Sequence, residues 1–104
     1  VTTVLGSITD PNLPAAGVDL ALLVEAYHEF SHPWEMMTSV YRALKPGAVL
    51  VMVESRVENP GDEDHSLHEM TEAQVRREIT AAGFQWVESG DFLPKQHFIV
   101  FRKR

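Results

Sequence analysis

The sequence contains no cysteine, which removes disulfides, a thiolate nucleophile and every cysteine-type zinc site from consideration. A chain without cysteine fits a reducing compartment, so we predict a cytoplasmic protein. No apolar run has membrane-spanning length and no signal peptide is visible, so no membrane partner is expected. Positive charge is also scarce, because nine Lys and Arg stand against 15 Asp and Glu. Nucleic-acid binding needs a basic face, and the net charge of −6 argues against it.

What remains is an ordinary globular composition, with 44% hydrophobic and 23% charged residues in 104 positions. This length is enough for one domain with a single core and too short for two. The chain does not begin with Met and opens directly on a strand-like run. We therefore expect residues 1–104 to form a single domain that is truncated upstream.

Five segments have the composition of strands. Residues 1–5 are β-branched and apolar, and the runs 18–26 and 48–54 are almost continuously apolar, as in strands buried on both faces of a parallel sheet. Residues 85–89 and 97–102 follow each other without an intervening helix, so they should pair antiparallel.

Two helices are marked by their ends. The first has His32 as a possible N-cap and Pro33 at the favoured first position, with an apolar stripe formed by Trp34, Met37, Tyr41 and Leu44. The second begins at Thr71, where Gln74 completes a capping box and Met70 and Val75 suit a hydrophobic staple, and it ends at Gly83 with Phe84 in a Schellman motif. The polar stretch 56–68 between the third strand and this helix is predicted to be a long loop. Strands alternating with helices predict an α/β sheet.

Several of these segments resemble, in the right order, class I S-adenosylmethionine-dependent methyltransferases. Residues 19–24 resemble the family's fourth strand, and 27–30 (Tyr-His-Glu-Phe) follow where the family often has a histidine. Residues 42–47 (Arg-Ala-Leu-Lys-Pro-Gly) are similar to its "LKPGG" turn, and 71–84 to its last helix. The expected closing hairpin is the family's addition to a Rossmann-like sheet. The resemblance thus implies a partial Rossmann-like methyltransferase sheet, mostly parallel with a C-terminal antiparallel hairpin.

The same resemblance shows what this sequence does not contain. The family sheet has the order 3-2-1-4-5-7-6, and this chain would supply strands 3 to 7 without the first two. The glycine-rich loop after the first strand, which approaches the methionine end of the cofactor, has no counterpart, because no Gly-x-Gly occurs. We therefore expect S-adenosylmethionine to be the family cofactor, with weak or absent binding to this chain, which alone should be inactive or nearly so.

The resemblance also implies which residues would lie along the cofactor. Ser7 and Ile8 would be nearest the adenine ring, followed by Asp10, for which an Asx-turn before Pro11 is an equally weighted alternative. The segment 25–27 (Glu25, Ala26, Tyr27) falls at the carboxyl end of the second strand, where open α/β sheets bind ligands. Tyr27 would stack on the cofactor or wall the acceptor pocket, unless it packs the next helix.

His28 and Glu29 are the catalytic candidates. His28 would act as a general base or orient the acceptor nucleophile, and the alternative is a histidine that caps a turn. Residues 28–32 also read His-Glu-Phe-Ser-His, the H-E-x-x-H pattern of zinc hydrolases. Pro33 would end such a helix at once, and a third ligand would have to come from Glu54, His65, His68 or Glu69 at no recognisable spacing. We therefore assign no metal ligand and keep the zinc hydrolase as a minor alternative.

The predicted parent enzyme transfers a methyl group from S-adenosylmethionine to a small-molecule or protein acceptor. A second hypothesis is a non-enzymatic fragment that associates with itself. The run 18–26 would be a sheet edge without Pro or Lys, the residues that usually protect an edge from pairing. We therefore predict a homodimer through this edge.

Overall fold

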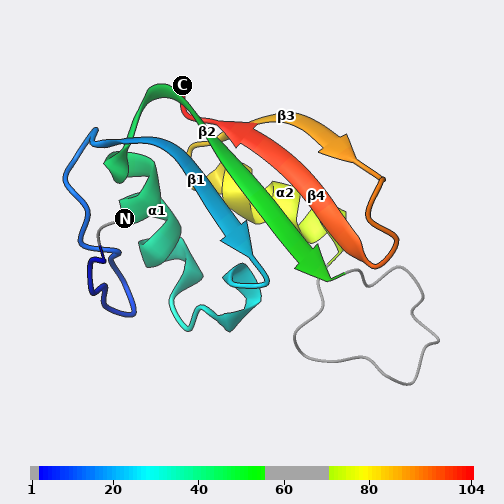
Figure 1. The fold of residues 1–104 in the computed structure, drawn as a ribbon, viewed down its shortest axis with the longest axis horizontal. Coiled ribbons are helices and arrows are strands. Elements are labelled where there is room, and N and C mark those ends of the chain that lie inside the picture. Colours follow the sequence, from blue (N-terminus) through cyan, green and yellow to red (C-terminus); the bar gives the residue numbers. More distant parts are fainter. Residues whose placement is uncertain (1–2, 56–70) are drawn as a thin grey trace.

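The computed structural model describes residues 3–55 and 71–104. A four-stranded sheet has the order β1-β2-β4-β3, and two helices, α1 and α2, pack on one of its faces (Figure 1). In chain order the elements are β1 Val18–Val24, the 3₁₀ turn η1 Tyr27–Glu29, α1 Pro33–Ala43, β2 Leu44–Ser55, α2 Glu72–Ala81, β3 Gln85–Gly90 and β4 Gln96–Arg102.

The sheet combines one parallel and two antiparallel pairs. β1 pairs parallel with β2, and β4 pairs antiparallel with both β2 and β3. The closing antiparallel hairpin and the order of the last four strands agree with the prediction. The described sheet is mixed, with one parallel pair beside the antiparallel hairpin.

Residues 3–5 are not a strand, and residues 1–2 lie outside the described part of the chain. Leu5 is 89% exposed, and its carbonyl oxygen accepts a hydrogen bond from the Asn12 side chain rather than from a neighbouring strand. A β-branched composition favours a strand only where another strand is present to pair with it.

The other strand boundaries shift by a few residues. β1 ends at Val24, because Glu25 adopts a left-handed φ of 53° that breaks the extended run. β2 begins at Leu44 and not at Ala48, because Leu44, directly after α1, is already extended with φ −78° and ψ 143°. Gly47 has a left-handed φ of 82°, a conformation that glycine adopts without strain.

Both helices begin where predicted. Pro33 opens α1, although His32 at the N-cap makes no side-chain capping hydrogen bond. The hydroxyl of Thr71 accepts a hydrogen bond from the backbone N–H of Gln74 at 3.1 Å, as an N-cap should. The Gln74 side chain instead donates to Glu78.

The end of α2 is the predicted Schellman motif. Gly83 has φ 112°, and its N–H donates to the carbonyl of Thr80, while the N–H of Phe84 donates to that of Ile79. Met70, one member of the proposed hydrophobic staple, and the predicted loop 56–68 lie outside the described residues.

The core lies between the helices and one face of the sheet. Met37 of α1, Leu50 and Met52 of β2, Ile79 of α2 and Phe101 of β4 are all nearly or fully buried in it. The predicted apolar stripe of α1 is wrong at its first member, since Trp34 is 55% exposed. Along β1 the side chains alternate, so Leu20, Leu22 and Val24 remain more than half exposed.

Candidate functional site

Two carboxylates meet at the carboxyl ends of β1 and β2. The strands run parallel with Val24 opposite Val53, so the residues that follow, Glu25 and Glu54, are neighbours at the same edge of the sheet. The N–H of Glu25 donates to the carbonyl of Val53 at 2.8 Å, which holds the left-handed Glu25 against β2. Ligands of open α/β sheets bind at this edge.

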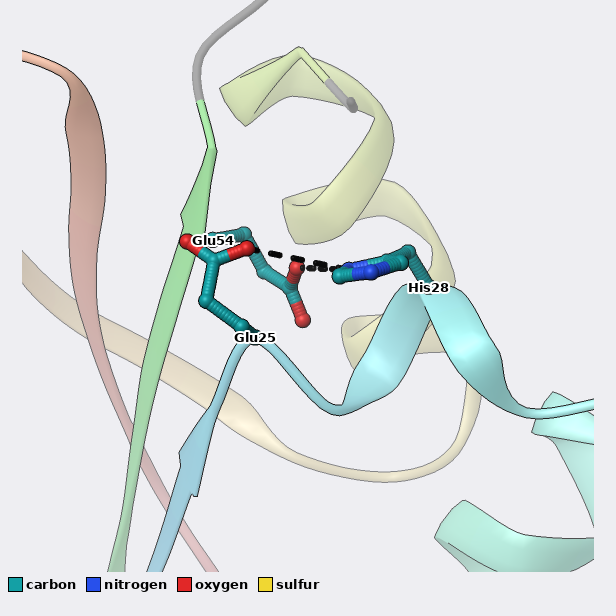
Figure 2. A group of neighbouring side chains, drawn as sticks. All are labelled: Glu25, His28 and Glu54. Atoms are coloured by element: carbon teal, nitrogen blue, oxygen red, sulfur yellow. Dashed lines mark hydrogen bonds and ion pairs between the residues drawn. The ribbon is translucent and has the colours of Figure 1, made fainter. Parts of the chain in front are cut away.

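His28 approaches both carboxylates from η1 with the same edge of its ring, as Figure 2 shows. Its Nδ1 lies 2.7 Å from Oε2 of Glu54 and 4.0 Å from Oε2 of Glu25. Its Nε2 lies 3.2 Å from Oε1 of Glu29. The imidazole is 6% exposed and the Glu54 side chain is fully buried, whereas Glu29 is 61% exposed.

Neutral donors fix the two carboxylates. The backbone N–H of Tyr27 donates to Oε1 of Glu54 at 2.8 Å. Ser55 Oγ and Gln96 Nε2 donate to Glu25 at 2.9 and 2.7 Å. Each carboxylate therefore has a defined orientation, with Oε2 directed toward the imidazole.

The surroundings of His28 have opposite effects on its protonation. Burial lowers the pKa of His28, but the hydrogen bond with Glu54 and the negative charges of Glu54, Glu29 and Glu25 outweigh it, so the pKa is raised above 6.5. His28 therefore holds its proton more strongly than an exposed histidine does.

Tyr27 is directed away from this edge. Its ring is 4% exposed and packs edge-on against Phe30, with 5.9 Å between ring centroids. Its hydroxyl donates to Oε1 of Glu78 on α2 at 2.6 Å. Burial, and then the hydrogen bond and charge of Glu78, raise the pKa of Tyr27 well above 10. The Tyr27 side chain is thus buried against Phe30 and hydrogen-bonded to α2, and its contact with a cofactor or an acceptor stays a prediction.

Next to Tyr27, a mostly apolar pocket of about 350 Å³ opens between α1 and α2. The residues that line it are Tyr27, Pro33, Trp34, Met37, Glu78, Ala81 and Ala82. The half-exposed indole of Trp34 thus lines this pocket and does not pack in the core.

The other predicted cofactor residues lie elsewhere. Asp10 accepts hydrogen bonds from the Asn12 N–H, which is the Asx-turn alternative, and from the Arg42 guanidinium near the end of α1. Ser7 and Ile8 belong to the same turn. The Ser39 hydroxyl of α1 donates a hydrogen bond to the carbonyl of Thr9, which attaches this turn to α1. Within residues 3–55 and 71–104, no hydrogen bond joins this turn to the segment 25–27.

In the described part of the chain, the predicted cofactor residues therefore lie in two separate places. Glu25 and Ala26 lie at the predicted edge, but the Tyr27 ring is buried and the 7–10 turn is attached to another part of the fold. The cofactor assignments remain predictions.

The H-E-x-x-H pattern does not lie on one helix. η1 ends at Glu29, Phe30 is extended, and His32 precedes α1. The three residues of the described part that come together as a potential cation-binding group are Glu25, His28 and Glu54, with His32 excluded. The zinc-hydrolase arrangement of that motif is therefore wrong.

Sequence reasoning named Glu54 only as a possible third ligand of the H-E-x-x-H pattern, and it did not place Ser55 or Gln96 in a site. The available signal was Glu54 itself, a carboxylate directly after an apolar strand. Its contact with His28 depends on the register between β1 and β2, which the local sequence does not state.

Comparison with known proteins identifies the family of this chain. Residues 1–52, half of the chain, match the family model described as "Methyltransferase domain". The search of curated proteins gives no significant match.

Solved structures share the fold. A SAM-dependent methyltransferase from Aquifex aeolicus superposes with a TM-score of 0.87 at 17% identity, over 99% of this chain and 55% of that one. Human N-acetylserotonin methyltransferase in complex with SAM gives 0.76 at 21% identity, over 94% and 32%. A Burkholderia thailandensis 1,6-didemethyltoxoflavin-N1-methyltransferase with bound S-adenosylhomocysteine gives 0.69 at 19% identity, over 86% and 45%.

The chain thus spans about half the length of the Aquifex aeolicus protein, and less than half of the length of the other two. Its mixed sheet, with helices on one face and a closing antiparallel hairpin, is part of the Rossmann-like fold that these proteins share. The chain belongs to the methyltransferase domain family.

Proposed function

We propose that this chain is the part of an S-adenosylmethionine-dependent methyltransferase domain that faces the methyl acceptor. The observation that carries the proposal is the polar cluster of His28, Glu25 and Glu54 at the carboxyl ends of adjacent parallel strands. In an open α/β sheet this is the edge where ligands bind. The family and the bound ligands named for the solved relatives support S-adenosylmethionine as cofactor. When bound, the cofactor supplies an activated methyl group on a sulfonium.

The roles of this chain's residues follow from their places. His28 is held by Glu54 and orients the acceptor nucleophile, with the exposed Glu29 beside it. Positioning of this kind is the main contribution a protein makes to a transfer reaction. Glu25 and Ala26, and the backbone of Tyr27, form the cofactor side of the same edge, with Ser7, Ile8 and Asp10 as the proposed adenine contacts. The acceptor is a small molecule or a protein. A cytoplasmic location belongs to the same proposal and rests on the absence of cysteine.

The test is a titration of the ¹⁵N-labelled chain with S-adenosylhomocysteine, followed residue by residue by NMR. Because the sequence has no Gly-x-Gly, we expect weak binding, at millimolar concentrations. Amide shifts should be confined to the neighbourhood of residues 25–29 and to the 7–10 turn. Glu25→Gln should reduce them, and Glu88→Gln, an exposed acid on β3, should not.

Two outcomes would count against this assignment. Amide shifts centred on β3 and β4 would place the ligand away from the proposed edge. Tight binding, at micromolar ligand, would show that the missing Gly-x-Gly loop is not the main cofactor contact. The second candidate is a non-enzymatic fragment that associates with itself, and absent binding, which the missing loop also allows, would favour it. The exposed Leu20, Leu22 and Val24 of β1 are the observation in favour of that candidate.

A further inference from the structure

The imidazole of His28 has a carboxylate at each nitrogen. Glu54 Oε2 lies 2.7 Å from Nδ1, and Glu29 Oε1 lies 3.2 Å from Nε2. A neutral imidazole carries one N–H, so it can donate to only one of these two carboxylates. The arrangement is satisfied either by a second proton on the ring or by a cation on the Nδ1 side, where Glu25 also points its Oε2.

We propose that Glu25, His28 and Glu54 form a site for a divalent cation. The ligands are Nδ1 of His28 and one oxygen from each carboxylate, and these atoms lie within 4.8 Å of one another. Cation–ligand bonds of about 2.0–2.6 Å place two ligand atoms about 3–4 Å apart at right angles and about 4–5 Å apart on opposite sides of one ion. One ion therefore fits among the three atoms once Nδ1 and Oε2 of Glu54, now 2.7 Å apart, separate slightly, and Figure 2 shows the three side chains converging.

The contacts around the three residues are those that a cation site needs. With Nδ1 bound to the ion, the proton of His28 moves to Nε2 and faces Glu29, which gives the carboxylate–histidine–metal arrangement that fixes a ligating imidazole. The Tyr27 N–H holds the other oxygen of Glu54, and Ser55 and Gln96 hold Glu25. The ligands are thus oriented before the ion binds.

Charge favours the same conclusion. Glu54 is fully buried, and in the described part of the chain the ion pairs of both Glu25 and Glu54 are with His28. Two carboxylates around one imidazole leave an excess of negative charge in a poorly solvated place, which a divalent ion compensates. Two carboxylates with one imidazole suit a cation such as Mn²⁺, with further positions open to water or a ligand oxygen.

The experiment is a titration of the chelator-treated chain with Mn²⁺, in which electron paramagnetic resonance reports the free ion. We expect one bound Mn²⁺ per chain. His28→Ala and Glu25→Gln remove a ligand and should weaken binding by more than about 100-fold. Glu29→Gln alters a residue that lies beside Nε2 of His28 and is not a ligand, so it should weaken binding by about 10–100-fold. Glu25 is one-third exposed, so its variant is expected to fold, and circular dichroism checks this.

Two control variants complete the design. Glu88→Gln removes an exposed acid far along the chain and should leave the affinity unchanged. His32→Ala should also leave it unchanged, because His32 is not in the group. The absence of Mn²⁺ binding at millimolar concentration, undiminished binding in His28→Ala and Glu25→Gln, or loss of binding in His32→Ala would each overturn the site. No cofactor is present in this titration, so its outcome is independent of the proposed methyl transfer.

Discussion

The hydroxyl of Tyr27 gives a sharp test of how the 3₁₀ turn is attached to the rest of the fold. It donates a 2.6 Å hydrogen bond to Glu78, 51 residues further along the chain, and the tyrosine is almost fully buried. Tyr27→Phe removes this one bond and keeps the ring in its place. Since η1 carries His28, the bond connects the candidate site to α2.

The size of the effect follows from the environment of the bond. A hydrogen bond to a charged group contributes about 1.5–3 kcal/mol to stability. Glu78 is only partly buried and keeps its second bond, from Gln74, so water can replace the lost hydroxyl. We therefore expect Tyr27→Phe to lower the free energy of unfolding by about 1–2 kcal/mol, which for a chain of this length is about 5–10 °C in Tm.

The same substitution at the other tyrosine is the control. Tyr41 is held through its ring, which packs edge-on against Phe84 and lies under the Lys103 ammonium, and phenylalanine retains both contacts. Tyr41→Phe should therefore change stability by less than about 0.5 kcal/mol.

Urea denaturation followed by circular dichroism measures both variants, and a double-mutant cycle with Glu78→Gln isolates the pair. The expected coupling between Tyr27 and Glu78 is about 1 kcal/mol. If Tyr27→Phe were no more destabilising than Tyr41→Phe, or if the coupling were absent, the bond would not anchor η1 and the reasoning would be refuted.

Two further predictions concern the ends of the helices and are measured in the same way. Thr71→Ala removes an N-cap hydrogen bond and should cost about 1 kcal/mol, whereas His32→Ala, at an N-cap without such a bond, should cost close to nothing; equal costs would contradict this. Gly47 and Gly83 both have left-handed φ, so alanine should cost about 1 kcal/mol at either. The cost should be greater at Gly83, where a Cβ would lie 3.2 Å from the Tyr41 ring, and the reverse order would show that the contact relaxes freely.

The helices could be predicted from sequence because their signals are local. Pro33, Thr71 and Gly83 act on the backbone within a turn of themselves, and the structure confirms each of them as a helix start or end. The first strand could not be predicted in this way. Residues 3–5 have the composition of a strand, but only hydrogen bonds from another strand make one.

The candidate site was predicted only in part, for the same reason. His28 and Glu29 were found because they follow an apolar run that ends at the sheet edge. Glu54 lies 26 residues away from His28, and it reaches the imidazole because α1 returns the chain into a parallel strand in the register that sets Val24 opposite Val53. A shift of one residue in that register would turn Glu54 to the other face of the sheet.

The exposed side of β1 leads to a last prediction, the homodimer. β1 has β2 on one side and is an edge of the described sheet on the other. From Leu20 to Val24 this edge carries no charge, Pro or Lys, and Leu20, Leu22 and Val24 are 59%, 60% and 54% exposed. The opposite edge, β3, carries Glu88. An unprotected apolar edge is a template for another strand, and a second copy offers the same strand in reverse across a twofold axis.

We therefore expect light scattering to report a dimer at micromolar concentration. A lysine at position 22 would bring two like charges close to each other across the twofold axis, so Leu22→Lys should give a monomer or unfold the chain. The matched variant Thr80→Lys adds the same charge on the exposed side of α2 and should remain dimeric. Hydrogen exchange separates the outcomes further, because the outward amides of β1 should be protected only in the dimer. A wild-type monomer at these concentrations, or a Leu22→Lys variant that stays dimeric, would mean that this edge does not join two copies.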